Sequence, residues 1–202
     1  MRTAEQQLVR RILKGDEAAF SELVEAYQHL VYSTALSISQ NRDDAMDISQ
    51  EVFLRIYRRL DGFRFESALS TWIYRICVTA ALDFCRARNR HSTVSLTSAE
   101  EGNGWDVPDE DFAPDRVLER LLTAEDIRQG MARLEEEYRV VFTLRDVQGL
   151  SYDQIAAVTG LEPGTVKSRI SRARKKMRLF LLKQGTCRGQ GPSNEAGKGE
   201  GE

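Results

Sequence analysis

The chain has 202 residues, of which 41% are hydrophobic and 30% are charged, and with a formal net charge of -2 this composition fits a globular protein that folds in water. No stretch approaches the ~18 consecutive apolar residues that a membrane-spanning helix needs, and the N-terminus lacks the apolar core of a signal peptide, so we expect a cytoplasmic protein without membrane insertion. The three cysteines are odd in number and not closely spaced, which excludes a disulfide framework and a zinc site, and no cofactor or metal is indicated.

Residues 1–91 predict a first helical domain, because apolar residues recur at helical spacing and proline is absent. We expect helices at residues 5–13, 17–39, 43–60 and 70–89. The third helix has Asp43 and Asp44 in its first turn, where carboxylates complement the helix dipole. Its predicted buried side consists of Ile48, Val52, Ile56 and Tyr57. Its outer side shows Asp47, Gln50, Glu51 and Arg55.

The third helix also offers an alternative function, because its sequence DDAMD matches the aspartate-rich pattern with which prenyl-diphosphate synthases bind magnesium. Such an enzyme needs a second acidic motif that faces the first across an apolar cavity. The sequence has no second DDxxD motif, and the chain is short for that fold. Helix capping is the ordinary explanation for these aspartates, so we expect no enzymatic activity.

The helix predicted at 70–89 has two apolar sectors with a polar stripe between them. One sector consists of Ile73, Ile76, Cys77, Ala80, Phe84 and Ala87, and the other of Tyr74, Val78, Leu82 and Cys85. The polar stripe includes Trp72, Arg75 and Thr79. An aromatic ring beside arginine suits unpaired bases, because stacking a base on such a ring contributes ~1–3 kcal/mol. The alternative, a core tryptophan with a solvated rim of arginines, is equally compatible with the spacing.

Two segments of polar composition divide the rest of the chain. Residues 92–115 contain acidic residues among Gly, Ser, Asn and Pro without one Lys or Arg, which predicts a flexible acidic linker. Residues 116–183 predict a second helical domain, and residues 184–202 have almost nothing to bury, which predicts a disordered tail. The sequence therefore predicts an all-α fold, with two small helical domains joined by the linker.

The second domain contains the pattern of a helix-turn-helix. Ser151 is a predicted N-cap, Gly160 closes the first helix, and Pro163 lies in the first turn of the second helix. The second helix has one apolar face, made of Val166, Ile170, Ala173 and Met177. The opposite face presents Ser168, Ser171, Arg172 and Lys175, and the flanks carry Lys167, Arg169, Arg174 and Lys176.

No acidic residue interrupts the second helix from residue 165 to residue 178. In a helix-turn-helix the second helix enters the major groove, so its outward side chains meet base edges and its flanking cations meet phosphates. The alternative is a solvated basic helix packed on a small bundle. The turn pattern, and the concentration of positive charge in a chain that is nearly neutral overall, favour DNA binding.

Three segments, in this order and at this spacing, resemble those of bacterial extracytoplasmic-function sigma factors, the minimal two-domain form of the RNA polymerase specificity subunit in the sigma-70 family. The segments are DAMDISQEVFLRIYRRLDGF at 44–63, FRFESALSTWIYRICVTAALDFCRARNR at 63–90 and LSYDQIAAVTGLEPGTVKSRISRARKKM at 150–177. They resemble the family's core-polymerase-binding segment, its promoter-melting and minus-10 segment, and its minus-35 helix-turn-helix. The resemblance implies three partners: core RNA polymerase through its β′ and β subunits, promoter DNA, and an anti-sigma factor.

By position, the resemblance implies a role for three sets of side chains. The polymerase set, which is expected to dock on the clamp coiled coil of the β′ subunit, consists of Asp47, Gln50, Glu51 and Arg55. The minus-10 set, expected around a flipped base, is Arg64, Glu66, Ser67, Ala68, Trp72, Arg75 and Thr79. The minus-35 set is Thr165, Lys167, Ser168, Arg169, Ser171, Arg172, Lys175 and Lys176, with Ser168, Ser171 and Arg172 as the base-reading positions. Phe65 and Thr79 depart from the Gly and Asn that the family often has.

A conventional helix-turn-helix regulator is the competing interpretation. Its N-terminal domain would sense a signal or dimerise, and its C-terminal domain would bind a palindrome as a dimer. Co-purification with core RNA polymerase distinguishes the two classes.

Overall fold

The computed structural model describes residues 2–92 and 123–189, and all secondary structure within these ranges is helical. The prediction of an all-α fold with two helical regions is therefore confirmed. Apart from its first residue, the predicted acidic linker at 92–115 lies outside the described residues, as does the chain beyond 189.

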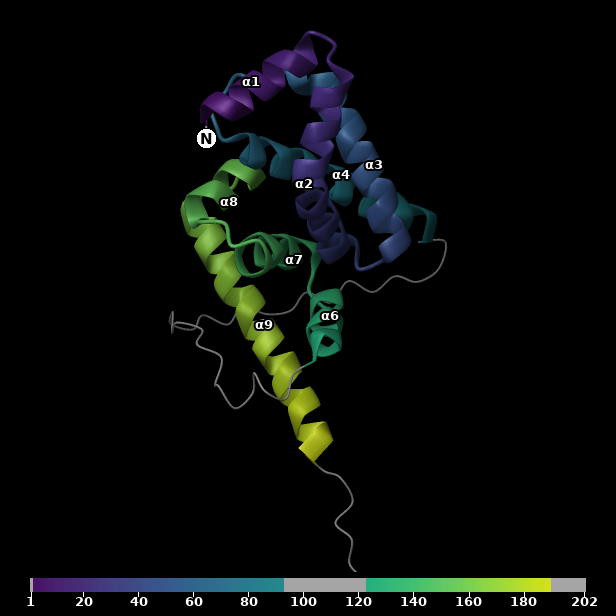
Figure 1. Cartoon of the computed structure of the whole chain (residues 1–202). Coiled ribbons are helices and arrows are strands. Elements are labelled where there is room, and N and C mark those ends of the chain that lie inside the picture. Colours follow the sequence, from purple (N-terminus) through teal and green to yellow (C-terminus); the bar gives the residue numbers. More distant parts are fainter. Residues whose placement is uncertain (1, 93–122, 190–202) are drawn as a thin grey trace, which may run out of the picture.

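The helices fall into an N-terminal and a C-terminal region (Figure 1). The N-terminal region contains α1 (Arg2–Leu13), α2 (Glu17–Ser39), α3 (Arg42–Arg59), the short 3-10 helix η1 (Leu60–Gly62) and α4 (Leu69–Ser92). The C-terminal region contains α6 (Ala124–Ala132), α7 (Glu136–Phe142), the π-helical turn η2 (Thr143–Val147), α8 (Tyr152–Thr159) and α9 (Pro163–Gly189). Helix α9 continues beyond residue 183, where the sequence predicts the domain to end, and its last turns project away from the other helices.

Side-chain caps define where several helices begin. Asp16 caps α2 by accepting a hydrogen bond from the amide of Ala19, and Asn41 caps α3 by accepting from the amides of Asp43 and Asp44. The first turn of α3 therefore has its free amides satisfied by a neighbouring side chain and its dipole complemented by two carboxylates.

The helix-turn-helix has the caps and the core that the sequence predicts. Ser151 caps α8 in a capping box with Gln154, and Gly160 ends α8 in the left-handed conformation with φ of 72°. The four apolar positions of α9 are buried, with Val166, Ile170 and Ala173 at 0% exposure and Met177 at 2%. The core face that the sequence predicts for this helix is thus confirmed.

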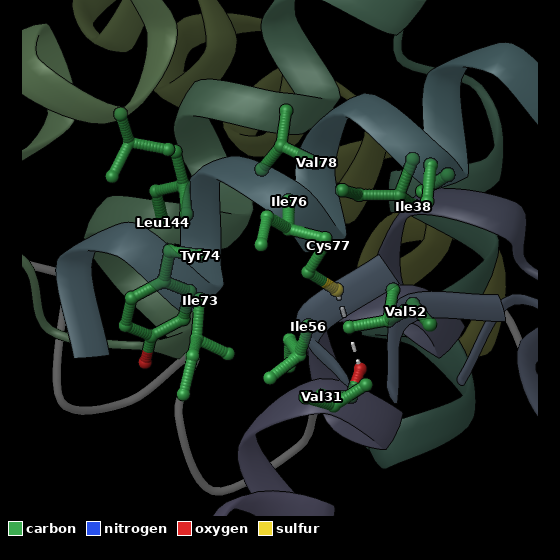
Figure 2. Packing of buried hydrophobic residues seen from close by; sticks show 14 of the residues in the cluster. Val31, Ile38, Val52, Ile56, Ile73, Tyr74, Ile76, Cys77, Val78 and Leu144 are labelled. Atoms are coloured by element: carbon green, nitrogen blue, oxygen red, sulfur yellow. Dashed lines mark hydrogen bonds between the residues drawn. The ribbon is translucent and has the colours of Figure 1, made fainter. Parts of the chain in front are cut away.

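One hydrophobic core extends through both regions. It joins Ile73, Tyr74 and Val78 of α4 to Leu144 of η2 and Ile155 of α8, and Figure 2 shows α4 and η2 residues of this cluster together. Helix α4 contacts α2 and α3 on one side and α8 on another, while α2 contacts α7 and η2. A second cluster, which includes Leu134, Ala173, Met177 and Leu181, packs α6, α7 and α9 together. The two regions, predicted as loosely joined bodies, are docked on each other in this structure.

Within the two described ranges, none of the helices combines the length and the apolar character needed to cross a membrane.

Candidate nucleic-acid and protein interfaces

The outer face of α3 carries the sequence-predicted polymerase set, but its members differ in how they contact their surroundings. Asp47 and Gln50 are both exposed, whereas Glu51 and Arg55 are half-buried. Arg55 donates from Nε to Glu51 Oε1 at 2.7 Å and from Nη1 to Asp83 Oδ2 of α4 at 3.2 Å. The hydrogen bond to Glu51 raises the pKa of Arg55 above its ordinary value. Arg55 therefore links α3 to α4, whereas Asp47 and Gln50 are the two members of the set that are exposed to solvent.

The same face of α3 exposes apolar side chains that the sequence analysis missed. Met46 is partly exposed at 55%, Leu54 is 49% exposed and Tyr57 is 62% exposed. Together with Gln50 they follow a spacing of three or four residues and so form one stripe along the helix. The prediction that Tyr57 is buried is wrong, although its ring makes an edge contact with Phe20 at 5.1 Å between centroids. The sequence did contain a signal for this stripe, because these apolar residues recur at helical spacing on a face of α3 whose other residues are polar.

The loop from residue 63 to residue 68, between η1 and α4, is organised by aromatic contacts. Phe63 is buried, and its ring centroid lies 4.8 Å from that of Phe65 and 5.2 Å from that of Trp72. Phe65 has a positive φ of 58°, a conformation that favours glycine. Arg64, Glu66 and Ala68 are exposed, and the half-buried Ser67 donates to the carbonyl of Ala68 at 3.3 Å.

A cationic cavity of about 300 Å³ brings part of the minus-10 set together. Its lining is Arg55, Arg59, Gly62, Trp72, Arg75, Ile76 and Thr79. Trp72 is half-buried, so it is neither a full core residue nor a free ring, and its ring packs on Phe63. The structure thus places Trp72, Arg75 and Thr79 around one cavity, whereas residues 64–68 do not contribute to its lining.

Thr79 makes a hydrogen bond within its own helix, whereas Arg75 makes one to the C-terminal region. Thr79 donates from Oγ1 to the carbonyl of Arg75 within α4 at 2.8 Å. Arg75 donates from Nη2 to the carbonyl of Ala157 at 2.5 Å, which crosses to α8 of the C-terminal region.

The residues of the minus-35 set lie on α9 with different degrees of exposure. Lys167, Ser168, Arg172, Lys175 and Lys176 are exposed, and Thr165, Arg169 and Ser171 are half-buried. The flanking cations are held by acidic side chains of α7, of the residue before it and of η2, which orients them beside the helix. These ion pairs are Arg169 with Glu137 at 2.7 Å, Arg174 with Asp146 at 2.7 Å and Lys176 with Glu135 at 2.5 Å.

The DDAMD segment forms the beginning of α3. Asp43 and Asp47 are exposed, and Asp44 forms an ion pair with Arg88 of α4. In the part of the chain that the structure describes, no three His, Cys, Asp or Glu side chains are grouped so that they could hold a metal ion.

Comparison with known proteins places both regions in one family. The family model for sigma-70 region 2 matches residues 23–91, and that for sigma-70 region 4 matches residues 124–177. The chain is 38% identical over 174 residues to the RNA polymerase sigma-H factor of Pseudomonas aeruginosa, with 85% of this chain and 90% of that protein covered. It is 41% identical over 178 residues to the ECF RNA polymerase sigma-E factor of Escherichia coli, with 85% and 91% covered.

Solved structures show a similar fold. A structure of CnrH in complex with the cytosolic domain of CnrY matches with a TM-score of 0.62 and 24% identity, covering 89% of this chain and 98% of that chain. The sigma factor RpoE in complex with the anti-sigma factor NepR from Bartonella quintana matches with a TM-score of 0.63 and 23% identity, covering 81% and 96%. Both sigma-70 regions are present, and relatives share more than a third of the aligned residues, so the chain belongs to the extracytoplasmic-function sigma factors of the sigma-70 family.

Proposed function

We propose that this chain docks on core RNA polymerase through the outer face of α3, recognises the minus-35 element with α9 and holds the melted minus-10 element at α4. The observation that carries the proposal is the exposed basic face of α9 in a helix-turn-helix, in one chain with an arginine-lined cavity beside Trp72. One surface suits duplex DNA and the other suits unpaired bases, and a promoter-opening factor needs both.

The minus-35 step follows from the geometry of α9. Its apolar face is fully buried, so its opposite face is free to enter a major groove. Arg172 has the planar donor fork that pairs with guanine, while Ser168 and Ser171 can pair with several bases. Arg169 and Lys176, positioned by Glu137 and Glu135, then contact the phosphates.

The minus-10 step follows from the cavity on α4. Extruding a base from a duplex costs a few kcal/mol, and stacking on an aromatic ring recovers ~1–3 kcal/mol of this. Trp72 offers a half-exposed ring backed by Phe63, and Arg55, Arg59 and Arg75 supply positive charge around it. Binding energy placed on the separated strands shifts the population toward open DNA without any bond chemistry, so the chain acts as a binding factor and not as an enzyme.

The polymerase surface combines polar and apolar side chains. Asp47 and Gln50 border the exposed Met46, Leu54 and Tyr57, and this mixture of apolar contact area with a polar rim is typical of a protein interface. The chain works in the cytoplasm with the polymerase. An anti-sigma factor is a further expected partner, because both structural neighbours were solved with a bound protein and one of these proteins is an anti-sigma factor.

The test is association with purified core RNA polymerase. We expect the chain to co-elute with core polymerase in size-exclusion chromatography and the complex to bind promoter DNA that carries both elements. A chain that ignores core polymerase and binds a palindromic duplex as a dimer would instead establish the conventional helix-turn-helix regulator.

A further inference from the structure

Two cations, Arg169 and Lys176, form one flank of the outward face of α9. They are seven residues apart, which is almost two helical turns, so they lie on the same side of the helix. Arg169 follows Ser168 directly and therefore lies about 100° around the helix axis from that residue. When the outward face enters a major groove, a flank at this angle faces the phosphates of one strand.

Two carboxylates from outside α9 hold both cations of this flank. Arg169 Nη2 lies 2.7 Å from Glu137 Oε2, and Lys176 Nζ lies 2.5 Å from Glu135 Oε1. The ring of Tyr138 also contacts Lys176, with Nζ 5.0 Å from the ring centroid. Both ion pairs lie within the C-terminal region, so they do not depend on its packing against the N-terminal region. The two positive charges of the flank are matched by two negative charges.

Glu135 occupies the N-cap position of α7, but its side chain does not cap that helix. An N-cap residue is ordinarily Ser, Thr, Asp or Asn, whose short side chain accepts a hydrogen bond from a free amide of its own helix. The carboxylate of Glu135 instead accepts a hydrogen bond from Lys176, 41 residues further along the chain. Burial alone would raise the pKa of Glu135, but the hydrogen bond from Lys176 outweighs burial and the pKa lies below its ordinary value. Glu135 is therefore ionised at neutral pH and acts on α9.

The ion pair on the other flank of α9 differs, because it has the features of a structural contact. Arg174 donates to Asp146 from both Nε and Nη2, and each of these side chains is 22% exposed. Glu135 and Glu137 are more open to solvent, at 57% and 45%. Ion pairs as exposed as these contribute little to folding stability. Stability therefore does not account for the two carboxylates beside a helix that binds a polyanion.

A carboxylate that holds a cation changes how that cation meets DNA. Duplexes without a recognition sequence are bound almost entirely through phosphate contacts, and a long cationic side chain can follow phosphates in many placements of the duplex. A neighbouring carboxylate restrains the cation to one place and repels phosphates that lie elsewhere. Base contacts fix the helix in the groove, so only the placement in which the phosphates meet the restrained cations keeps their full contribution.

We propose that Glu135 and Glu137 are specificity-determining residues, which restrain Lys176 and Arg169 and thereby weaken binding to duplexes that lack a minus-35 element. This inference rests on the proposed function, because it takes α9 as the helix that binds this element. Discrimination then has a repulsive component, directed against the wrong DNA, in addition to the attractive base contacts.

Neutral variants of the full chain, in complex with core polymerase, test the inference. Glu135→Gln and Glu137→Gln are made singly, and each keeps the length of its side chain while removing the charge. The matched control is Glu125→Gln, because Glu125 is an exposed carboxylate of the C-terminal region that pairs with Arg128 of its own helix, at 2.5 Å. Fluorescence anisotropy at several salt concentrations measures the binding of each complex to two promoter duplexes. The two duplexes share the minus-10 element, and one of them has its minus-35 element replaced.

We expect Glu135→Gln and Glu137→Gln each to tighten binding to the replaced duplex roughly three- to tenfold, with little change on the complete promoter. The preference for the complete promoter therefore falls by the same factor. On the replaced duplex, the slope of log affinity against log salt should become steeper by about 0.9, which corresponds to one additional phosphate contact. Glu125→Gln should match the parent complex in the preference and in the slope.

Unchanged binding of both variants to the replaced duplex would overturn the inference. A loss of binding to the complete promoter alone would overturn it as well, since the carboxylates would then only support the two cations. If the parent complex itself does not distinguish the two duplexes, recognition by α9 fails, and the proposed function fails together with the inference.

Discussion

Arg172 is the exposed residue of α9 with the clearest chemical preference for one base. A guanidinium fork donates two parallel hydrogen bonds to guanine, so we expect Arg172→Ala to cost ~1–3 kcal/mol at one position of the minus-35 element. Fluorescence anisotropy of the polymerase complex on a set of duplexes, each changed at one base pair, measures this loss.

Arg178→Ala is the matched control, because Arg178 is an exposed cation of the same helix outside the minus-35 set. It should weaken all duplexes alike and lower the salt dependence of binding. An equally uniform loss for Arg172→Ala would remove Arg172 from base recognition.

Trp72 has a structural contact with Phe63 and a proposed contact with a base, and different variants distinguish the two. Trp72→Ala deletes both the ring that packs on Phe63 and the proposed platform for a base, so we expect open complexes to fall by the ~1–3 kcal/mol of one stacked base while closed complexes persist. Trp72→Phe keeps an aromatic ring and should retain most of the opening. Permanganate footprinting reports open DNA, and a gel shift reports closed DNA. A parallel loss of both signals would identify a folding defect.

Two residues, Phe65 and Tyr57, show what could not be predicted from the sequence. The departure of Phe65 from the family's common glycine was visible in the sequence, but its positive φ, which explains that glycine, required the fold. Tyr57 was assigned to the buried side of its helix by spacing alone. Spacing gives a direction around the helix axis, whereas exposure depends on what packs there, and the edge contact with Phe20 leaves most of this ring in solvent.

At the scale of elements, the turn between α8 and α9 depends on Gly160. Its φ of 72° strains any residue with a Cβ, although a Cβ at this position would meet no other atom within 4 Å. We expect Gly160→Ala to lower the free energy of unfolding by about 1 kcal/mol. Gly164→Ala is the control, because Gly164 has an ordinary φ and equally open surroundings, and it should be neutral or slightly stabilising. Urea unfolding measures the free energy of unfolding of both variants, and equal values would contradict the strain argument.

The apolar stripe on α3 extends the proposed polymerase surface beyond the residues that the sequence analysis identified. Leu54 is 49% exposed and lies between Gln50 and Tyr57 on this stripe. We expect Leu54→Glu to weaken binding to core polymerase at least tenfold while the thermal unfolding midpoint stays near that of the parent, because the residue contributes little to the core. Leu179→Glu on α9 matches it in exposure, at 51%, and should leave this affinity unchanged. Undiminished binding by Leu54→Glu would exclude the stripe from the docking surface.

Helix positions were accessible to sequence reasoning because each helix carries its own signals. Apolar periodicity, the cap at Ser151 and the glycine that ends α8 are local, and the structure reproduces them. The cap of α3 shows the limit, since Asn41 holds the amides of Asp43 and Asp44 while the sequence analysis considered only the two carboxylates.

At the scale of the whole molecule, the docked arrangement was the feature that the sequence analysis did not predict. The sequence analysis recognised the second apolar sector of α4, but an apolar stripe does not indicate which element packs against it. The partner comes from η2 and α8, far along the chain, and contacts at this separation depend on how whole helices pack. Under the proposed function, promoter selection likewise depends on both regions, and we expect neither the cavity on α4 nor the face of α9 to select a promoter by itself. We expect the selectivity to come from joining two weak contacts at a matched span.

Run-off transcription by core polymerase with this chain, on templates that differ only in the spacing between the two elements, tests the central claim most directly. We predict RNA that requires the chain, requires both elements, and falls steeply when the spacer is lengthened or shortened by a few base pairs. RNA synthesis that is absent with the chain, or that persists when either element or the spacing is changed, would contradict the account.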